Sequence, residues 1–396
     1  MKLQNRKLLL IVLPTAMCAV LIVVWWQRST PDSRYRAAVI AMEAGDYSHV
    51  AEAIKELRSH PGSKSRVHYL TAAYLLHSGD PEAAMKTLSS FEPDDETRIP
   101  ALLLVCESCY RLGRLMEAEA AARKLIQEQS DNAEAHRWLA AVYYDLGANE
   151  AALTQLARLS KLSPDDFKPH RLMALMHHDF RQHAEAIEHY RKALALSPPL
   201  QIREEIHSEL ATSLVAQRKY AQAVKVLDNA NNSALNYALR SECRWSLGET
   251  QQAWSLLEEA KKIDPDERAA LLLEARMGMS EGNPDLAVIA LERRLQRDPH
   301  DAECRYQLAN AFRQLGQMQE FEREMTKWRT ANGLLDRLTE LSKEAIRKPN
   351  DREIRTQIAE VCDQLGKHEL AESWRRAAGA YRQPAGPSTS NSNSIE

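Results

Sequence analysis

The apolar residues of this chain recur in short blocks that have the spacing of an amphipathic helix. One block places apolar side chains three or four positions apart, at Leu139, Val142, Tyr143 and Leu146. A second block follows at Ala152, Leu153, Leu156, Leu159 and Leu162. Gly147 lies between them and suits a helix end, because glycine adopts the left-handed conformation without a Cβ clash. Pro164 ends the second block, since proline disfavours helix at the residue before it. The pattern predicts two helices joined by a tight turn.

This two-helix unit recurs every 34 residues. Its turn glycine returns at Gly45, Gly79, Gly113 and Gly147, and again at Gly248, Gly282 and Gly316. A second ladder has the same step at Val50, Ala84, Ala118, Ala152 and Ala186, and at Ala253, Ala287 and Phe321. A fixed period of this size predicts one supersecondary unit stacked into a solenoid. Solenoids of this kind serve mainly as binding surfaces.

The unit resembles the tetratricopeptide repeat family, which has a small residue at position eight, a large one at eleven, glycine near fifteen and alanine at twenty. Ala133–Asp166 matches this pattern with Ala140, Tyr143, Gly147, Ala152 and Pro164. Phe167–Leu200 and Glu267–Asp301 match it in part. The resemblance covers residues 34–382 and implies an all-α fold, a right-handed helical-hairpin solenoid of about ten repeats.

Two departures from the period are informative. Arg181 replaces the turn glycine of the fifth unit. The step from Phe321 to Ala371 is 50 residues, sixteen more than the period. The added stretch, residues 334–348, reads as one more helix ending at Pro349, an irregular insertion that acts as a hinge, a cap or a dimer contact.

The N-terminus predicts a membrane anchor. Residues 1–7 form a basic flank, and residues 8–26 carry no charge and end in Trp25-Trp26. About 20 apolar residues span a bilayer, and tryptophans favour its interface. A cleaved signal peptide is the alternative, but no small-x-small site follows the run. Clustered charge before the span favours a cytoplasmic N-terminus and extracytoplasmic, periplasmic-type repeats. The tail, residues 383–396, is rich in Ser, Asn and Pro and is expected to be disordered.

Composition and motifs argue against several functions. The formal net charge of −3 gives no sign of the basic surface that a nucleic-acid-binding protein needs. The chain has no phosphate-binding loop, dinucleotide fingerprint or nucleophile elbow. We therefore expect no catalytic residues, no cofactor and no enzyme activity.

Two groups of residues are candidates for metal or redox chemistry. Cys106 and Cys109 form a C-x-x-C pair, but they take the eighth and eleventh positions of the third unit, where packing favours small apolar side chains. The fifth unit is rich in histidine, at His170, His177, His178, His183 and His189. No ligand spacing accompanies these histidines, so we expect no metal site, and a metal-dependent factor or enzyme subunit using this repeat is kept as an alternative.

The family resemblance also implies which residues bind a partner. In tetratricopeptide proteins the second, fifth, ninth and twelfth positions of each first helix line a groove. The candidates at these positions are Tyr110, Arg137, Tyr144, Lys168, Arg171 and His178. Arg137 and Arg171 would stack one repeat apart and suit an acidic or C-terminal peptide. The family's chaperone-binding clamp has asparagine at the ninth position, where this chain has Glu107, Ala141, Leu175 and Thr212. Asn310 in the ninth unit is an exception, but Arg276 and Glu360 flank it without the rest of the set, so we expect no such clamp.

Together these features predict a membrane-anchored protein-interaction scaffold or assembly factor at a bacterial-type envelope. Its partner would be a protein or peptide, and its oligomeric state is open. One alternative faces the cytoplasm and regulates an enzyme or protease docked at the membrane.

Overall fold

The computed structural model describes residues 30–146, 148–348 and 351–379. Every regular element in these ranges is an α-helix, which confirms the all-α prediction. The predicted span at residues 8–26 and the tail at residues 383–396 lie outside them. Among the helices that are described, none is long and apolar enough to cross a membrane.

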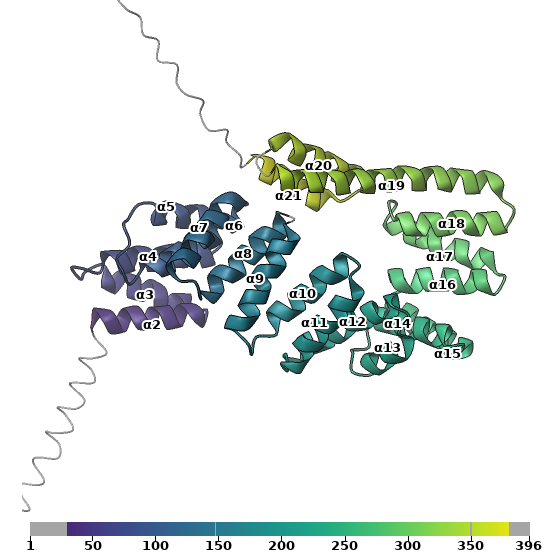
Figure 1. Cartoon of the computed structure of the whole chain (residues 1–396), viewed down its shortest axis with the longest axis horizontal. Helices are drawn as coiled ribbons and strands as arrows, with labels where there is room; N and C mark the ends of the chain where they lie inside the picture. The colour runs from purple at the N-terminus through teal and green to yellow at the C-terminus, as the bar shows by residue number, and fades with distance from the viewer. Residues whose placement is uncertain (1–29, 147, 349–350, 380–396) are drawn as a thin grey trace, which may run out of the picture. The chain divides into compact units, whose positions relative to one another are not determined.

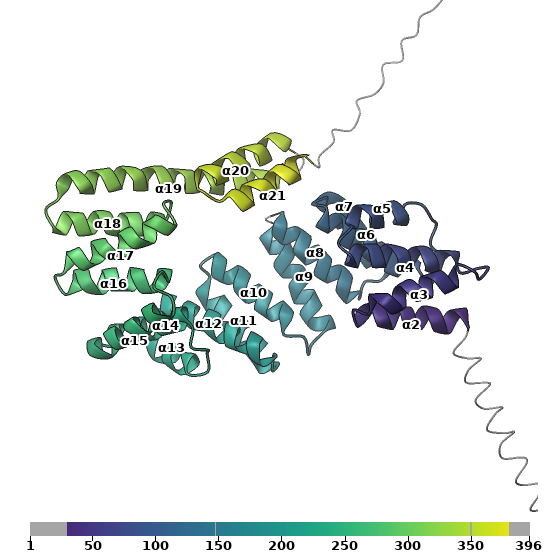
Figure 2. The same ribbon diagram turned by 180° about the vertical axis from the view of Figure 1, so that it is seen from behind.

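The helices pair in sequence order, and the chain divides into two compact units, Met1–Leu139 and Ala140–Glu396 (Figures 1 and 2). The N-terminal unit contains α2 (Pro31–Glu43), α3 (Tyr47–Leu57), α4 (Lys64–His77), α5 (Pro81–Leu88), α6 (Arg98–Arg111) and α7 (Leu115–Glu128). Helix α8 (Ala133–Asp145) crosses the division.

The C-terminal unit continues with α9 (Asn149–Leu162), α10 (Lys168–Asp179), α11 (His183–Ala195), α12 (Leu200–Ala216), α13 (Tyr220–Leu227), α14 (Ala234–Ser246) and α15 (Thr250–Ile263). It ends with α16 (Arg268–Ser280), α17 (Pro284–Arg297), α18 (Ala302–Gln314), α19 (Met318–Arg347), α20 (Arg352–Gln364) and α21 (His368–Gly379). Even-numbered helices are the first helices of their hairpins.

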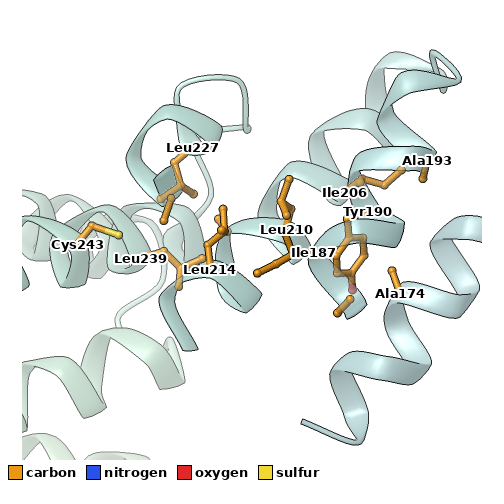
Figure 3. Packing of buried hydrophobic residues seen from close by; sticks show 13 residues of the cluster. Ala174, Ile187, Tyr190, Ala193, Ile206, Leu210, Leu214, Leu227, Leu239 and Cys243 are labelled. Carbon is orange, nitrogen blue, oxygen red and sulfur yellow. The ribbon is translucent and has the colours of Figure 1, made fainter. Parts of the chain in front are cut away.

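The alanine ladder of the sequence lies where two helices of a hairpin meet. The side chains are fully buried at Val50, Ala84, Ala118, Ala152, Ala186, Ala253 and Ala287. Larger residues fill the space between hairpins, as in the cluster where Tyr190, Ile206 and Leu214 pack together (Figure 3). The 34-residue period therefore sets both the hairpin contact and the core.

The turn between helices keeps one backbone conformation even without glycine. Gly282 has φ +79°, and Arg181, which replaces the glycine, has φ +58°. Arg218 takes the same conformation in the next turn, at φ +57°. A left-handed residue with a Cβ costs about 1 kcal/mol, so these two turns are strained relative to the others.

The expected separate helix at residues 334–348 is wrong, because α19 runs without a break for 30 residues. Gly333 lies inside it, but one glycine weakens a helix by only about 1 kcal/mol. The apolar stripe continues past it, and Ala331 and Leu341 are both buried. The insertion therefore lengthens an existing helix, which stops before Pro349.

The longer α19 changes how the last hairpin packs. First helices of successive hairpins contact each other in the pairs α12–α14, α14–α16 and α16–α18. Within the described chain, α18 and α20 make no such contact. Sixteen extra helical residues add about 24 Å, so α20 packs against the far half of α19, beyond the N-terminus of α18 (Figure 1).

Candidate binding surface

Arg171, a predicted groove residue on α10, is already held by two carboxylates of α12. Its Nη2 donates to Glu205 Oε2 at 2.8 Å and to Glu209 Oε1 at 2.5 Å, and its Nε donates to Glu209 Oε2 at 3.3 Å. These ion pairs tie two neighbouring first helices together. A partner's carboxylate would have to compete with both glutamates for this guanidinium.

Tyr144 and His178 also have polar neighbours. Tyr144 is 47% exposed and hydrogen-bonds to Asp179; burial first, and the Asp179 charge next, raise its pKa. His178 Nδ1 lies 2.9 Å from Ser213 Oγ, and its ring meets that of His183 edge-on. Both side chains are positioned by neighbours while one face of each stays accessible.

The other predicted residues lie at helix surfaces. Lys168 is exposed at the start of α10. Tyr110 packs its ring against Trp138, with centroids 5.4 Å apart. Arg137 pairs with Glu134 at 2.7 Å. Arg137 belongs to the N-terminal unit and Arg171 to the C-terminal unit, so the stacking of the two arginines stays a prediction.

The histidines of the fifth unit contact one another in pairs between α10 and α11. His170 Nδ1 and His189 Nδ1 lie 3.2 Å apart, and the ring of His177 stacks on that of His189. Burial first, and then the charge of Lys192, lower the pKa of His189 to about 4. Burial first, and then the charge of Lys192, also lower the pKa of His170, so His170 and His189 both favour the uncharged form at neutral pH. Among the described residues, no group of three or more His, Cys, Asp or Glu is arranged to hold a metal ion.

The cysteines belong to the core, as their helical positions predict. Cys106 and Cys109 are fully buried free thiols. Cys106 Sγ lies 3.4 Å from the carbonyl oxygen of Ala118, on the partner helix of the same hairpin. Burial raises the pKa of Cys106 to about 12 and that of Cys109 to about 11, so neither forms the thiolate that metal or redox chemistry needs.

Two clusters on the C-terminal unit were missed in the sequence. In one, the guanidinium of Arg276 lies 5.9 Å from the ring centroid of Trp245 and pairs with Glu242 at 2.9 Å. In the other, Tyr306 and Trp328 pack with their centroids 5.4 Å apart. The groove positions of the seventh to ninth units, applied as they were to the third to fifth, contain Trp245, Arg276 and Tyr306.

The Tyr306–Trp328 pair lines a cavity of about 920 Å³, the junction cavity. Its walls come from the starts of α16 and α18, the end of α17 and the loop after it, the middle of α19 and the α20–α21 turn, and Arg181 of the α10–α11 turn also lines it. The cavity lies where α18 and α20 fail to pack, so the lengthened α19 creates it. Two of its wall segments come close together at Gly366, where an added Cβ would lie 3.1 Å from His300 Cδ2.

Charged side chains surround the junction cavity. Arg268 donates to Asp301 at 2.7 and 3.1 Å and to Glu303 at 2.8 Å. Burial opposes ionisation of Asp301, but the bonds from Arg268 and from the Cys304 amide outweigh it and lower the pKa of Asp301 to about 2. Asp301 is therefore a permanent anion that fixes Arg268 at the cavity wall.

Comparison with known proteins agrees with the repeat pattern. Residues 110–176 and 172–199 match two models described as tetratricopeptide repeat. DnaJ homolog subfamily C member 3 of Rattus norvegicus is 26% identical over 208 residues, which are 48% of this chain and 41% of that protein. Its Gallus gallus counterpart is 25% identical over 231 residues, 54% and 46% of the two chains. The chain thus spans less than half the length of these relatives.

A solved structure of Pseudomonas aeruginosa pilF is similar at 19% identity and a TM-score of 0.43, covering 53% of this chain and 96% of that one. The two family models together identify tetratricopeptide repeats over residues 110–199, and the 34-residue step of the sequence continues on either side of them.

Proposed function

We propose that this chain is a scaffold that binds partner proteins on the exposed faces of its first helices. The observation that carries the proposal is the placement of aromatic and arginine side chains there. They lie partly exposed at Tyr110, Trp138, Trp245, Arg276 and Tyr306. Aromatic rings and guanidinium groups contribute most of the binding energy in protein interfaces.

The packing of these side chains prepares them for binding. The Arg276 guanidinium lies 5.9 Å from the ring centroid of Trp245 and is also held by Glu242 at 2.9 Å. A side chain that is already ordered loses little conformational entropy when a partner docks. The C-terminal unit carries Trp245, Arg276 and Tyr306 on three successive first helices, so a partner of several residues would meet more than one anchor.

Photo-crosslinking tests the proposal. A photoreactive residue is placed at Trp245 or Arg276 on the first helices, and at Ile289, which is 65% exposed on the second helix α17, as the control. We expect discrete crosslinked partners from the first-helix positions and none shared with Ile289. Identical products from all three positions would mean that the first helices are not the binding surface.

The scaffold is further proposed to act at a membrane, held there by residues 8–26, with its repeats on the extracytoplasmic side. Confinement to a membrane raises the effective concentration near membrane-bound partners without new contacts. Protease accessibility of a tag after Glu396 tests this orientation. Cleavage in intact spheroplasts supports it, whereas protection until the membrane is permeabilised favours the cytoplasm-facing alternative.

A further inference from the structure

We propose that the junction cavity is a binding site for an acidic peptide segment of a partner, one that carries an aromatic or aliphatic side chain beside its carboxylates. This inference rests on the proposed scaffold function and assigns it a second surface, which shares Tyr306 with the first. The cavity is a product of this chain's own irregularity, because the lengthened α19 moves α20 away from α18.

The charge of the lining selects for an anion. Five arginine and lysine side chains face three carboxylates around the cavity, whereas the whole chain has a formal charge of −3. Lys367, in the α20–α21 turn, is exposed and forms no ion pair within the described residues. Arg297 uses Nε and Nη2 for Asp266, which leaves its Nη1 without a partner in the same part of the chain. Positive charge is therefore concentrated and only partly neutralised here.

Another part of the lining is aromatic and apolar. Tyr306 is 46% exposed, although its ring packs on Trp328. The indole N–H of Trp328 has no acceptor within the described residues. The indole N–H of Trp254, which lies outside the cavity, shows the usual arrangement and donates to Glu281 at 2.8 Å. Leu335 on α19 adds a half-buried apolar side chain to this wall. An apolar side chain of the ligand would cover Tyr306, and a peptide carbonyl would accept from Trp328.

Size and charge spacing favour a peptide over other anions. A cavity of about 920 Å³ holds a few residues and is too small for a domain face. The carboxylates of Asp298, Asp301 and Glu303 lie among the cations. They would repel a continuous phosphate backbone, whereas a peptide spaces its charges and offers N–H groups between them.

Fluorescence anisotropy with the full-length chain in mild detergent tests the site. The probe is a labelled, end-capped nonapeptide with glutamates around one phenylalanine, and its match has glutamine for every glutamate. We expect the acidic peptide to bind more tightly than the glutamine peptide by about tenfold or more. Lys367→Glu should raise the dissociation constant of the acidic peptide by about tenfold or more. Tyr306→Ala should weaken both peptides. Lys225→Glu, at an exposed lysine of α13, is the control and should change affinity less than about twofold.

Three results would overturn the inference: no saturable binding of the acidic peptide, equal binding of the glutamine peptide, or an effect of Lys225→Glu equal to that of Lys367→Glu. Tighter binding of a single-stranded RNA probe that Lys367→Glu abolishes would reassign the cavity to a polyanion. If the crosslinked partner is still captured by Lys367→Glu while the peptide result is negative, the scaffold stands and only the junction site fails.

Discussion

The hairpins α16–α17 and α18–α19 are neighbours on one core, yet they organise the chain after them differently. Leu272, Leu291 and Leu308 join both hairpins in a single buried cluster. Helix α17 stops after 14 residues, and α18 then packs beside α16. Helix α19 continues for 30 residues, and α20 packs on its extension instead of on α18. The same hairpin interior thus supports either a regular stack or a cavity, depending only on where the second helix ends.

The greater length of α19 also separates the last hairpin, α20–α21, from the rest of the core. Helix α20 contacts both α19 and α21, and the cluster of these three helices contains Leu341, Ile358 and Ala371. A regular hairpin has neighbours on both sides. Stability in solenoids is a sum over such neighbour contacts, so the hairpin beyond the extension should unfold more independently than the others.

The largest expected effect comes from the core of this last hairpin. Ile358 is fully buried, and Ile358→Ala should cost about 3 kcal/mol through the cavity it leaves. Among the described helices, α19 is the one outside this hairpin that it packs on, so we expect amide hydrogen exchange to quicken in residues 352–379 and to change little in α12–α18. Hydrogen–deuterium exchange with mass spectrometry measures this directly.

Leu214→Ala is the matched control, since Leu214 is equally buried in a cluster that spans α10 to α14. In Leu214→Ala the faster hydrogen exchange should extend over several hairpins on either side of the substitution. Equal spreading in the two variants would show that the extended α19 transmits stability as well as a regular stack does.

The next largest effect concerns Asp301, the N-cap residue of α18. Asp301 accepts from the Cys304 amide at 3.2 Å and pairs with Arg268, and it is only 8% exposed. Asp301→Asn removes the charge but keeps the shape, and should cost about 2 kcal/mol at neutral pH. The equivalent residue before α16, Glu267, accepts only from the Ala269 amide at 3.2 Å, and Glu267→Gln should cost less than about 0.5 kcal/mol.

The pH dependence of Asp301 has a definite sign. Its folded pKa of about 2 lies below its ordinary value of 3.8, so its contribution is complete above about pH 4 and is lost as pH falls toward 2. The difference in unfolding free energy between wild type and Asp301→Asn should therefore shrink over this window. Chemical denaturation at several pH values measures it, and a constant difference would contradict the assigned pKa.

A smaller effect distinguishes two turns with the same backbone. Gly316, in the α18–α19 turn, has φ +73° and open space around it, whereas Gly366 has φ +70° and faces His300. Alanine at either position costs about 1 kcal/mol for the left-handed backbone. At Gly366 its Cβ would also lie 3.1 Å from His300 Cδ2, so Gly366→Ala should cost about 0.5–1 kcal/mol more than Gly316→Ala.

Comparing the two alanine variants cancels the effect of alanine on the unfolded chain. Adding His300→Ala should remove most of the extra cost at Gly366 and none at Gly316, as a double-mutant cycle would report. If the excess remains without His300, the junction turn is not in contact with the α17–α18 loop.

The repeats were predictable because they are local: a glycine, a small residue and a proline recur at fixed positions, and these fixed the hairpins and the buried cysteines. The continuity of α19 was not predictable, because the step of 50 residues indicated added helix but not whether it continues the helix before it. Packing of Leu341 in one cluster with residues of α20 and α21 shows what the extension gains. Of the candidate binding surface, the sequence placed Arg171 on the first helix. It could not show that Glu205 and Glu209, more than 30 residues away, already hold it.

The smallest effect tests whether the turn conformation or the glycine itself is required. Arg218 keeps φ +57° in the α12–α13 turn, and its side chain is exposed. Arg218→Gly removes strain of about 1 kcal/mol but lets the unfolded chain gain entropy, so we expect a net stabilisation of about 0.5 kcal/mol. Arg218→Ala keeps the Cβ and should not stabilise, which separates backbone strain from loss of the charge. A gain in both variants would trace the effect to the guanidinium instead, and the repeat would then tolerate a non-glycine turn at no backbone cost.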